Sequence, residues 1–365
     1  MKRLFQGVYQ RKTVLITGHT GFKGSWLAYW LHQLGANVVG YSLPAPTQPS
    51  HWALLRLPIT HVTGNVNDRS RLTDVLAEHQ PDIVMHLAAQ PLVRYSYQYP
   101  LETLETNVLG TANVLDSVRQ TPSVRAVVIV TSDKCYENPE DGRPLTEDSP
   151  MGGYDPYSMS KGAAELVTSS YRNSFFNPAS YGQTHQTLLA SVRAGNVIGG
   201  GDWAADRLIP DLIRGSVSGQ RVAIRNPEAV RPWQHVLEPL SGYLAVGQRL
   251  LAGDVLAATG WNFGPAPDDV LSVRAVVDQA KQRWDVVGVD EQPSAANPHE
   301  AHLLSLDCTK ARLALDWWPV WTTQTAIERT IDWYRAFYEH NQLCTDADIN
   351  AYVEQAEAAG LAWTR

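Results

Sequence analysis

The N-terminal half of the chain alternates between short apolar runs and longer segments whose apolar residues recur every three or four positions. Continuous apolar runs occur in "TVLITG", "PDIVMHLAA" and "RAVVIVTS". Such runs are typical of parallel strands that are buried on both faces. Helical spacing follows in "GSWLAYWLHQLG", "LETLETNVLGTANVL" and "PYSMSKGAAELVTSSY". Strands that alternate with helices predict an α/β fold with a doubly wound parallel sheet.

The pattern changes after residue 191. The next segment is rich in glycine and mixed charge, and only later do a helical stretch, "PLSGYLAVGQRLLAG", and a strand-like stretch, "GWNFG", return to the earlier alternation. We therefore expect a larger first domain and a smaller C-terminal α/β cap domain. The expected first domain comprises residues 1–191, to which 234–263 return, and the cap comprises 192–233 and 264–365.

Composition narrows the possible partners. Of 365 residues, 44% are hydrophobic and 18% are charged, which is typical of a globular protein, and the net charge of −7 without a Lys/Arg run argues against nucleic acid. No apolar stretch approaches the ~18 residues of a membrane span, and no signal-type core follows the N-terminus. The three Cys and the scattered His show neither disulfide nor metal-site spacing. We expect a cytoplasmic protein with no metal and no membrane partner.

A glycine-rich turn follows the first predicted strand. Gly18, Gly21 and Gly24 in "TGHTGFKG" have GxxGxxG spacing and open a helix. Glycines there allow a tight turn and a close approach to a pyrophosphate, which the helix N-terminus attracts. The alternative is a purely structural turn. The second strand ends at Ser42 rather than at the acid that usually binds the ribose of NAD, yet no Arg is near to attract a 2′-phosphate, so NAD is favoured over NADP.

Tyr157 and Lys161 form a YxxxK pair on one face of a predicted helix. An ammonium beside a phenol favours the phenolate, so the pair predicts proton transfer to or from a hydroxyl. The same spacing also arises by chance on a solvated helix face. The preceding glycine turn makes the catalytic interpretation the stronger one.

Three motifs together resemble the extended short-chain dehydrogenase/reductase family over nearly the whole chain: the glycine turn, "HLAAQ" at His86–Gln90 and "YSMSK" at Tyr157–Lys161. The resemblance implies a Rossmann fold, a tightly held NAD and a nucleotide-sugar substrate in the cleft between the domains. It also implies a homodimer, or a dimer of dimers, built through a four-helix bundle. By motif position, the further cofactor-binding residues would be Phe22, Lys23, Leu87, Ala88 and Ala89, with Tyr157 and Lys161.

The stretch "TSDK" indicates which reaction is expected. Ser132 can hydrogen-bond the same sugar hydroxyl as Tyr157, and Asp133 and Lys134 offer a proton donor and a proton acceptor side by side. Loss of water across two carbons needs these two roles. After C4 oxidation by NAD, Lys134 would remove the C5 proton and Asp133 would protonate the departing C6 hydroxyl. The hydride would then return to C6, and the C5 proton would be restored.

Other interpretations of the same residues stay open. Asp133 could cap a turn while Lys134 points to solvent, and the site could then belong to a nucleotide-sugar 4-epimerase or a reductase. A non-catalytic NAD-binding sensor is a third possibility, although such a protein would be expected to lose the Tyr, the Lys or the acid–base pair. Release of a 4-keto-6-deoxy product without net reduction of NAD would separate a dehydratase from these alternatives.

The Asp133–Lys134 form points to one branch of the family. Together with "TGHTGFKGSWL", "GGGDW" and "RPWQHVLEPLSGYL", it resembles the members that dehydrate CDP-glucose, whereas those acting on dTDP-glucose usually carry Asp-Glu. The resemblance implies CDP-4-dehydro-6-deoxy-glucose as product, which serves deoxysugar biosynthesis for the O-antigen of bacterial lipopolysaccharide. Spacing and composition do not themselves indicate cytosine, so another nucleotide sugar stays an alternative.

Four residues are predicted to bind the substrate. Arg231 matches the position whose Arg holds the diphosphate in relatives, and Asn196 matches one that contacts phosphate or sugar. Arg207 falls where the cap would meet the nucleotide, and Ser96 falls near the sugar. Each has a structural alternative: Arg231 could form a surface ion pair, Asn196 a turn, and Arg207 an ordinary helix charge.

Overall fold

The computed structural model describes residues 1–224, 226–291 and 304–365. Its centre is a seven-stranded parallel sheet in the order β11-β6-β5-β4-β1-β2-β3. The strands are β1 Thr13–Thr17, β2 Asn37–Ser42, β3 Thr60–Thr63, β4 Ile83–His86, β5 Ala126–Val130, β6 Leu188–Ala194 and β11 Gly260–Phe263. The apolar runs of the sequence are β1, β4 and β5, so the predicted doubly wound α/β fold is confirmed.

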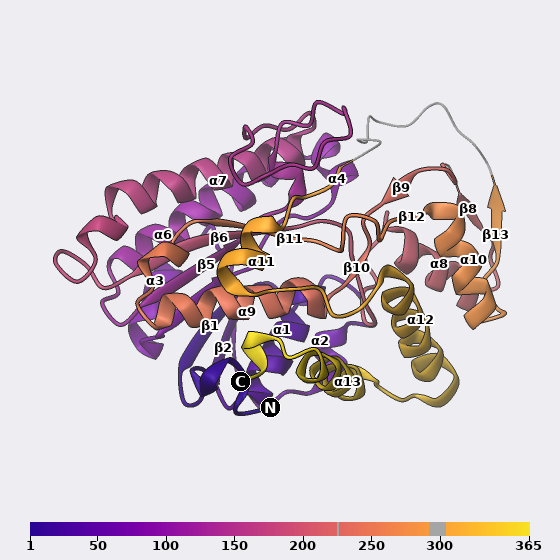
Figure 1. Ribbon diagram of the computed structural model, residues 1–365, viewed down its shortest axis with the longest axis horizontal. Helices are drawn as coiled ribbons and strands as arrows, with labels where there is room; N and C mark the ends of the chain where they lie inside the picture. Colours follow the sequence, from indigo (N-terminus) through magenta and orange to yellow (C-terminus); the bar gives the residue numbers. More distant parts are fainter. Residues whose placement is uncertain (225, 292–303) are drawn as a thin grey trace.

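Helices cover both faces of this sheet (Figure 1). One face packs against α1 Phe22–Gln33 and α9 Leu237–Leu251. The other packs against α3 Arg69–His79, α6 Gly110–Arg119 and α7 Pro156–Ser174. Because strand side chains alternate between the faces, Val14 and Ile16 belong to the first core and Leu15 to the second. The strands are therefore buried on both sides, as their continuous apolar runs require.

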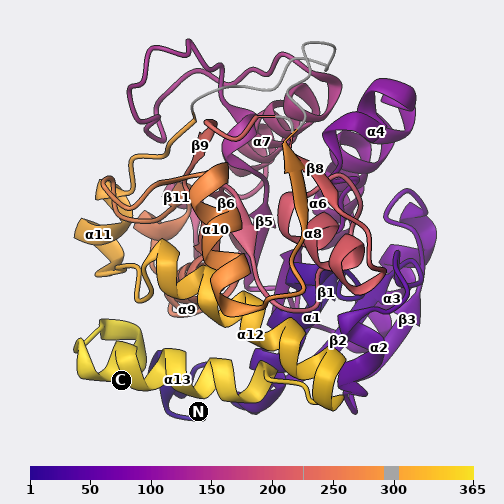
Figure 2. The ribbon, with the colours of Figure 1, turned by 90° about the vertical axis from the view of Figure 1, so that its right-hand side faces the viewer.

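A second group of elements lies beyond the carboxyl ends of β5 and β6. It contains α8 Leu208–Val217 and α10 Val273–Arg283 (Figure 2), together with short strand pairs. The pairs are β7 Val197–Ile198 with β10 Gln234–His235, β8 Val222–Ile224 with β13 Val289–Glu291, and β9 Val230–Arg231 with β12 Leu271–Ser272. The remaining α-helices are α2 His51–Leu55, α4 Val93–Gln98, α5 Pro100–Leu104, α11 Thr309–Leu315, α12 Thr323–His340 and α13 Thr345–Ala358.

The C-terminal segment packs against the beginning of the chain. Trp363 stacks on Phe5 with ring centroids 5.3 Å apart, and Tyr352 of α13 contacts Trp30 of α1. The backbone N–H of Gln6 donates to the carbonyl of Arg365 over 2.7 Å. These last residues, which we expected in the cap, thus lie on the sheet side of the molecule. The division into two domains stays an interpretation.

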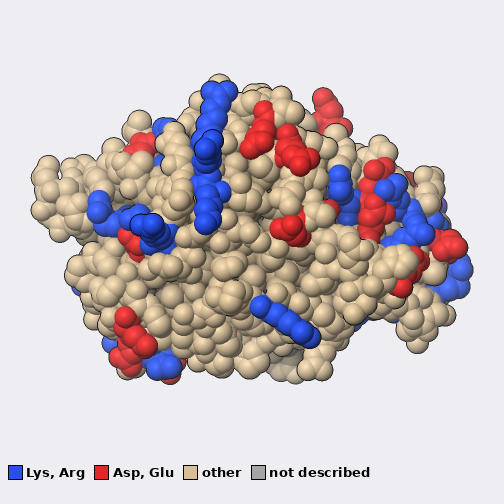
Figure 3. All heavy atoms as spheres, turned by 90° about the horizontal axis from the view of Figure 1, so that it is seen from below, with Lys and Arg blue, Asp and Glu red and all other residues tan. Residues whose placement is uncertain are grey.

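On the face seen from below in Figure 3, large areas carry no charged side chain, a column of Lys and Arg crosses the upper half, and Lys, Arg, Asp and Glu gather together at the right-hand end. Within the described ranges, no helix is long and apolar enough to cross a membrane. Among the same residues, no three His, Cys, Asp or Glu side chains come together as a metal site would require.

Candidate active site

A cleft of about 2050 Å³ opens at the carboxyl ends of the parallel strands, between the sheet and the elements around α8. This is where ligands bind in open α/β sheets. All but one of the predicted site residues line it. From the first βα turn come Gly18, Gly21, Phe22, Lys23 and Gly24; from the ends of β4 and β5 come Leu87, Ala88, Ala89, Ser132, Asp133 and Lys134; from α7 come Tyr157 and Lys161; and from the far wall come Asn196, Arg207 and Arg231.

Ser96 is the exception and is not among the residues that line the cleft. Its side chain is fully buried, its hydroxyl donates to the carbonyl of Val93 over 2.6 Å, and it accepts from the N–H of Tyr157 over 3.1 Å. Ser96 therefore contacts the first turn of α7 rather than the space a sugar would occupy. The match to a family motif placed Ser96 near the sugar, and the structure places it beside Tyr157 because α4 packs on α7.

The glycine turn fits a dinucleotide. Gly18 has φ +78°, and a Cβ there would lie 2.7 Å from the Ala88 nitrogen, while a Cβ on Gly24 would lie 2.1 Å from the Gly18 carbonyl oxygen. Both positions thus exclude a side chain. A Cβ on Gly21 would meet only the Gly18 oxygen, at 3.4 Å, so it would otherwise enter the open space at the N-terminus of α1. The turn leaves that space to the pyrophosphate of a cofactor.

Uncharged groups surround the position where the adenosine ribose of a dinucleotide would lie. The hydroxyls of Thr20 and Ser42 are 2.8 Å apart, and that of Thr20 also donates to the carbonyl of Leu43. Beside them, burial and the neighbouring His61 lower the pKa of His19 to about 3, so His19 is neutral. Residues 64–66, at the end of β3, complete this wall and were not predicted from the sequence. The sequence signal that identifies them is their position directly after a strand, at the edge of the sheet where ligands bind.

Tyr157 and Lys161 occupy the first turns of α7. Asp155 caps this helix by accepting from the N–H of Ser158, and Pro156 fits its first position. Burial raises the pKa of Tyr157 to about 12, although a hydrogen bond with Ser132 lowers it. Burial also lowers the pKa of Lys161 to about 8, although Cys135 and Glu165 raise it. Burial thus favours the neutral form of both groups and sets their pKa values further apart than in water, so the phenol of Tyr157 is protonated at neutral pH. Two groups with such shifted pKa values in one cleft are typical of a catalytic site.

The acid–base pair lies in a short 3-10 helix, η3 Asp133–Cys135, directly after β5. Ser132 caps it by accepting from the N–H of Lys134, and the Ser132 hydroxyl donates to the Asp133 carboxylate over 2.8 Å. Burial raises the pKa of Asp133, although Lys134, Ser132 and Lys23 oppose the shift. A carboxyl group whose pKa is raised is suited to donate a proton. Lys134 is only half-buried and lines the cleft.

Positive charges flank this pair. Burial, Arg207 and Lys161 lower the pKa of Lys23 to about 7, and Asp133 raises it. Arg207 donates to Asp202 over 2.8 Å at the start of α8, and Arg231 lies in β9 on the same wall. A substrate diphosphate at this wall would meet the guanidinium groups of both arginines. Asn196 lies between β6 and β7, where its carbonyl accepts from the N–H of Gln234.

Several known proteins with similar sequences are named as nucleotide-sugar 4,6-dehydratases. Residues 15–330 match the family model described as GDP-mannose 4,6 dehydratase. The chain is 51% identical over 350 residues to CDP-glucose 4,6-dehydratase of Salmonella typhimurium, which covers 94% of this chain and 97% of that protein. It is 26% identical to dTDP-glucose 4,6-dehydratase of Xanthomonas campestris, over 88% of this chain and 93% of that protein.

Several solved structures with a similar fold contain NAD. MoeE5 in complex with UDP-glucose and NAD superposes with a TM-score of 0.74 at 25% identity, over 89% of this chain and 99% of that one. The dTDP-glucose 4,6-dehydratase DesIV of Streptomyces venezuelae, solved with NAD, gives a TM-score of 0.74 at 24% identity, over 88% and 97%. At that identity the second likeness concerns the fold alone.

Proposed function

The chain belongs to the GDP-mannose 4,6-dehydratase family of extended short-chain dehydrogenases/reductases, and we propose that it uses NAD to convert CDP-D-glucose to CDP-4-dehydro-6-deoxy-D-glucose. The observation that carries this proposal is that the Ser132–Lys134 turn and the Tyr157–Lys161 helix line one cleft. The CDP moiety is supported by the 51% identical relative, which is named for that substrate.

The side chains in the cleft can carry the proton transfers. Tyr157 takes the proton of the 4-hydroxyl with Ser132 as hydrogen-bond partner, and Lys161 stabilises the phenolate. Lys134 removes the C5 proton, which the 4-keto group has acidified, and Asp133 gives a proton to the departing C6 hydroxyl. NAD, when bound, would take up the C4 hydrogen with its electron pair and give it back at C6, and Lys134 returns a proton to C5, so that the overall reaction is a loss of water without net redox change.

The proposed reaction is tested by offering the protein a panel of nucleotide-glucoses with CDP-, dTDP-, UDP- and GDP- groups. We expect the alkaline absorbance of a 4-keto-6-deoxy product with CDP-glucose and little with the others. Activity with none of them would contradict the dehydratase function, and preference for another nucleotide would contradict the assignment of cytidine. Formation of the 4-epimer without a keto product would instead support the epimerase alternative. UDP-glucose 4-epimerases solved with NAD have a similar fold.

We further propose a homodimer, alone or paired into a tetramer, that works in the cytoplasm and supplies deoxysugars for bacterial O-antigen. Support for the dimer is a group of exposed apolar side chains on α5, on α7 and on the π-helical turn Glu105–Leu109 that joins α5 to α6; these elements contact one another. These are Leu101, Leu109, Met159 and Leu166, of which Leu101 is 73% exposed and Leu166 61%. Two copies that pair their α6 and α7 helices would bury them.

A further inference from the structure

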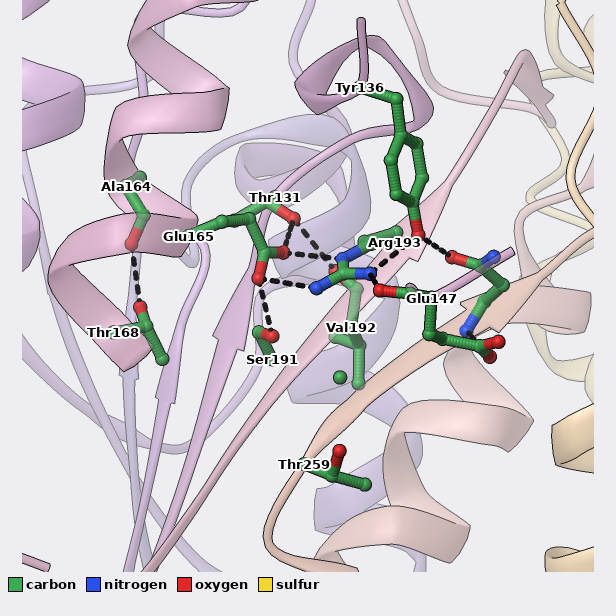
Figure 4. Close-up of polar contacts among 12 residues, drawn as sticks. Thr131, Tyr136, Glu147, Ala164, Glu165, Thr168, Ser191, Val192, Arg193 and Thr259 are labelled. Atoms are coloured by element: carbon green, nitrogen blue, oxygen red, sulfur yellow. Dashed lines mark hydrogen bonds and ion pairs between the residues drawn. The ribbon is translucent and has the colours of Figure 1, made fainter. Parts of the chain in front are cut away.

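Figure 4 shows a buried ion pair, Glu165 with Arg193, beside Thr131 and Tyr136. These two residues flank residues 132–135, here called the catalytic turn. Glu165 and Arg193 have side-chain exposures of 4% and 5%. One oxygen of the Glu165 carboxylate accepts from the Nε of Arg193 over 2.8 Å and from the Thr131 hydroxyl over 2.5 Å. The other accepts from the Nη2 of Arg193 and from the Ser191 hydroxyl, both over 2.7 Å. The carboxylate is thus held by four donors from two segments of the chain, β6 and the residue that follows β5.

Arg193 extends this network to a second set of segments. Its Nη1 donates to the hydroxyl of Tyr136 over 2.5 Å, and its guanidinium lies 5.1 Å from the centre of the Tyr136 ring. The Tyr136 hydroxyl in turn donates to the side-chain oxygen of Asn262 in β11 over 2.7 Å. The side-chain nitrogen of Asn262 donates to the carbonyls of Leu145 and Asp307. Together, Glu165, Arg193, Thr131, Ser191, Tyr136 and Asn262 are here called the Glu165 network.

The network holds the catalytic turn at both of its ends. Thr131 immediately precedes Ser132, and Tyr136 immediately follows η3, which carries Asp133 and Lys134. Glu165 lies one helical turn beyond Lys161 on α7. Tyr157 and Lys161 lie on α7, and Asp133 and Lys134 lie on η3. The ion pair therefore connects the two segments whose side chains must act on neighbouring carbons of one sugar.

We propose that the Glu165 network is a positioning device that fixes the η3 turn, and with it Lys134, relative to Tyr157 and Lys161, so that elimination can follow oxidation in the same bound sugar. Its members are positioning residues, because they touch the turn and the helix rather than the cleft, apart from Thr131. The inference rests on the proposed dehydratase function, since it assigns to the network the coupling of the two steps of that reaction.

Stability alone does not account for such a network. Two charges taken out of water gain little over apolar side chains of the same volume, so a buried ion pair is a poor way to strengthen a core. Hydrogen bonds, in contrast, are directional, and a fully satisfied network fixes one arrangement. None of the side-chain polar atoms of the six members is without a partner. The charge of Glu165 also opposes the lowering of the pKa of Lys161 by burial.

Tyr136→Phe is the first test, because it removes one hydroxyl from the network and keeps the ring that fills the space. In a single turnover with CDP-glucose and NAD, we expect C4 oxidation near the wild-type rate and elimination slowed by about 10- to 100-fold, as for a small misplacement of a reacting group. Reduced nicotinamide would then accumulate, which its absorbance reports. In deuterium oxide, incorporation of deuterium at C5 of the product would slow by the same factor.

A readout without substrate separates positioning from a general loss of structure. We expect faster backbone hydrogen exchange in residues 131–137 of Tyr136→Phe, with the thermal midpoint and the exchange of the other strands close to wild type. The matched control is Glu238→Gln. Glu238 is a second fully buried carboxylate, which accepts from two backbone N–H groups and from Tyr352. Its substitution should affect stability but should leave the ratio of the two steps unchanged.

The double variant Glu165→Gln with Arg193→Met guards against a misleading single substitution, since it removes both charges and leaves neither buried alone. It should show the same accumulation of reduced nicotinamide as Tyr136→Phe. Equal slowing of both steps in the two variants, or no slowing in either, would overturn the inference. Absence of a keto product from the wild type would instead overturn the proposed function, so the two failures can be told apart.

Discussion

Replacing Lys161 by Met should make the protein more stable while it destroys the activity. Lys161 is 5% exposed, and within the described residues its ammonium donates one long hydrogen bond, of 3.5 Å, to the carbonyl of Val130. A charge that is buried with so few partners costs free energy, which the unfolded chain does not pay. Met has nearly the same shape and no charge, so Lys161→Met removes the cost and keeps the packing.

The magnitude follows from the pKa. Burial lowers the pKa of Lys161 from 10.5 to about 8, although Cys135 and Glu165 raise it. At about 1.4 kcal/mol for each pH unit between the folded and unfolded values, the penalty at neutral pH is about 3 kcal/mol. For a chain of 365 residues this corresponds to about 4 °C in the thermal midpoint.

Because the pKa of Lys161 is lower in the folded protein than in the unfolded chain, the effect of Lys161 on the free energy of unfolding changes with pH in a defined direction. Below about pH 8, Lys161 is protonated in both states and the penalty is complete. Between about pH 8 and 10.5, the unfolded chain keeps a proton that the folded protein has lost, so the stability of the wild type rises with pH and the advantage of the variant disappears.

Urea unfolding of the NAD-free protein at several pH values measures this difference without a contribution from cofactor binding. The variant should be more stable by about 3 kcal/mol at neutral pH and equal to the wild type near pH 10.5. Lys161→Arg, which keeps the charge, is the control and should bring no gain. A variant that is less stable at neutral pH, or a difference that does not change with pH, would refute the reasoning.

Three further predictions concern the acid–base pair, the glycine turn and the proposed dimer face. Lys134→Ala should keep NAD binding and C4 oxidation but slow elimination by about 10²- to 10⁴-fold, and full turnover would refute the role of Lys134 as base. Gly24→Ala should lose NAD binding, measured by titration, and about 1–3 kcal/mol of stability, because its Cβ would lie 2.1 Å from the Gly18 oxygen; normal binding would contradict the close packing of the turn. Leu166→Glu should shift the protein toward the monomer in sedimentation, whereas Leu313→Glu, at a site 83% exposed on α11, should not; an unchanged mass for both would place the interface elsewhere.

Sequence periodicity predicted the fold because each buried strand is one continuous apolar run, and the glycine turn and the YxxxK pair are local patterns. The Glu165 network could not be predicted in the same way. Glu165 is one of many charges on a helix, and its partners Arg193, Tyr136 and Asn262 are distant in sequence and meet only when β6 and β11 pair. The contact of Ser96 with the Tyr157 N–H depends likewise on how α4 packs on α7.

The hydroxyls of Ser42, at the end of β2, and of Thr20, in the glycine turn, bear on how firmly the protein can distinguish NAD from NADP. An acid at this position rejects the 2′-phosphate by repulsion. Thr20 and Ser42 carry no charge, and His19 is neutral, so neither repulsion nor attraction acts on that phosphate here. Selectivity would then rest on a missing cation alone. A single substitution such as Ser42→Arg would supply that cation, and neither Thr20 nor His19 carries a negative charge that would oppose it. One substitution would therefore be enough to change the preference from NAD to NADP.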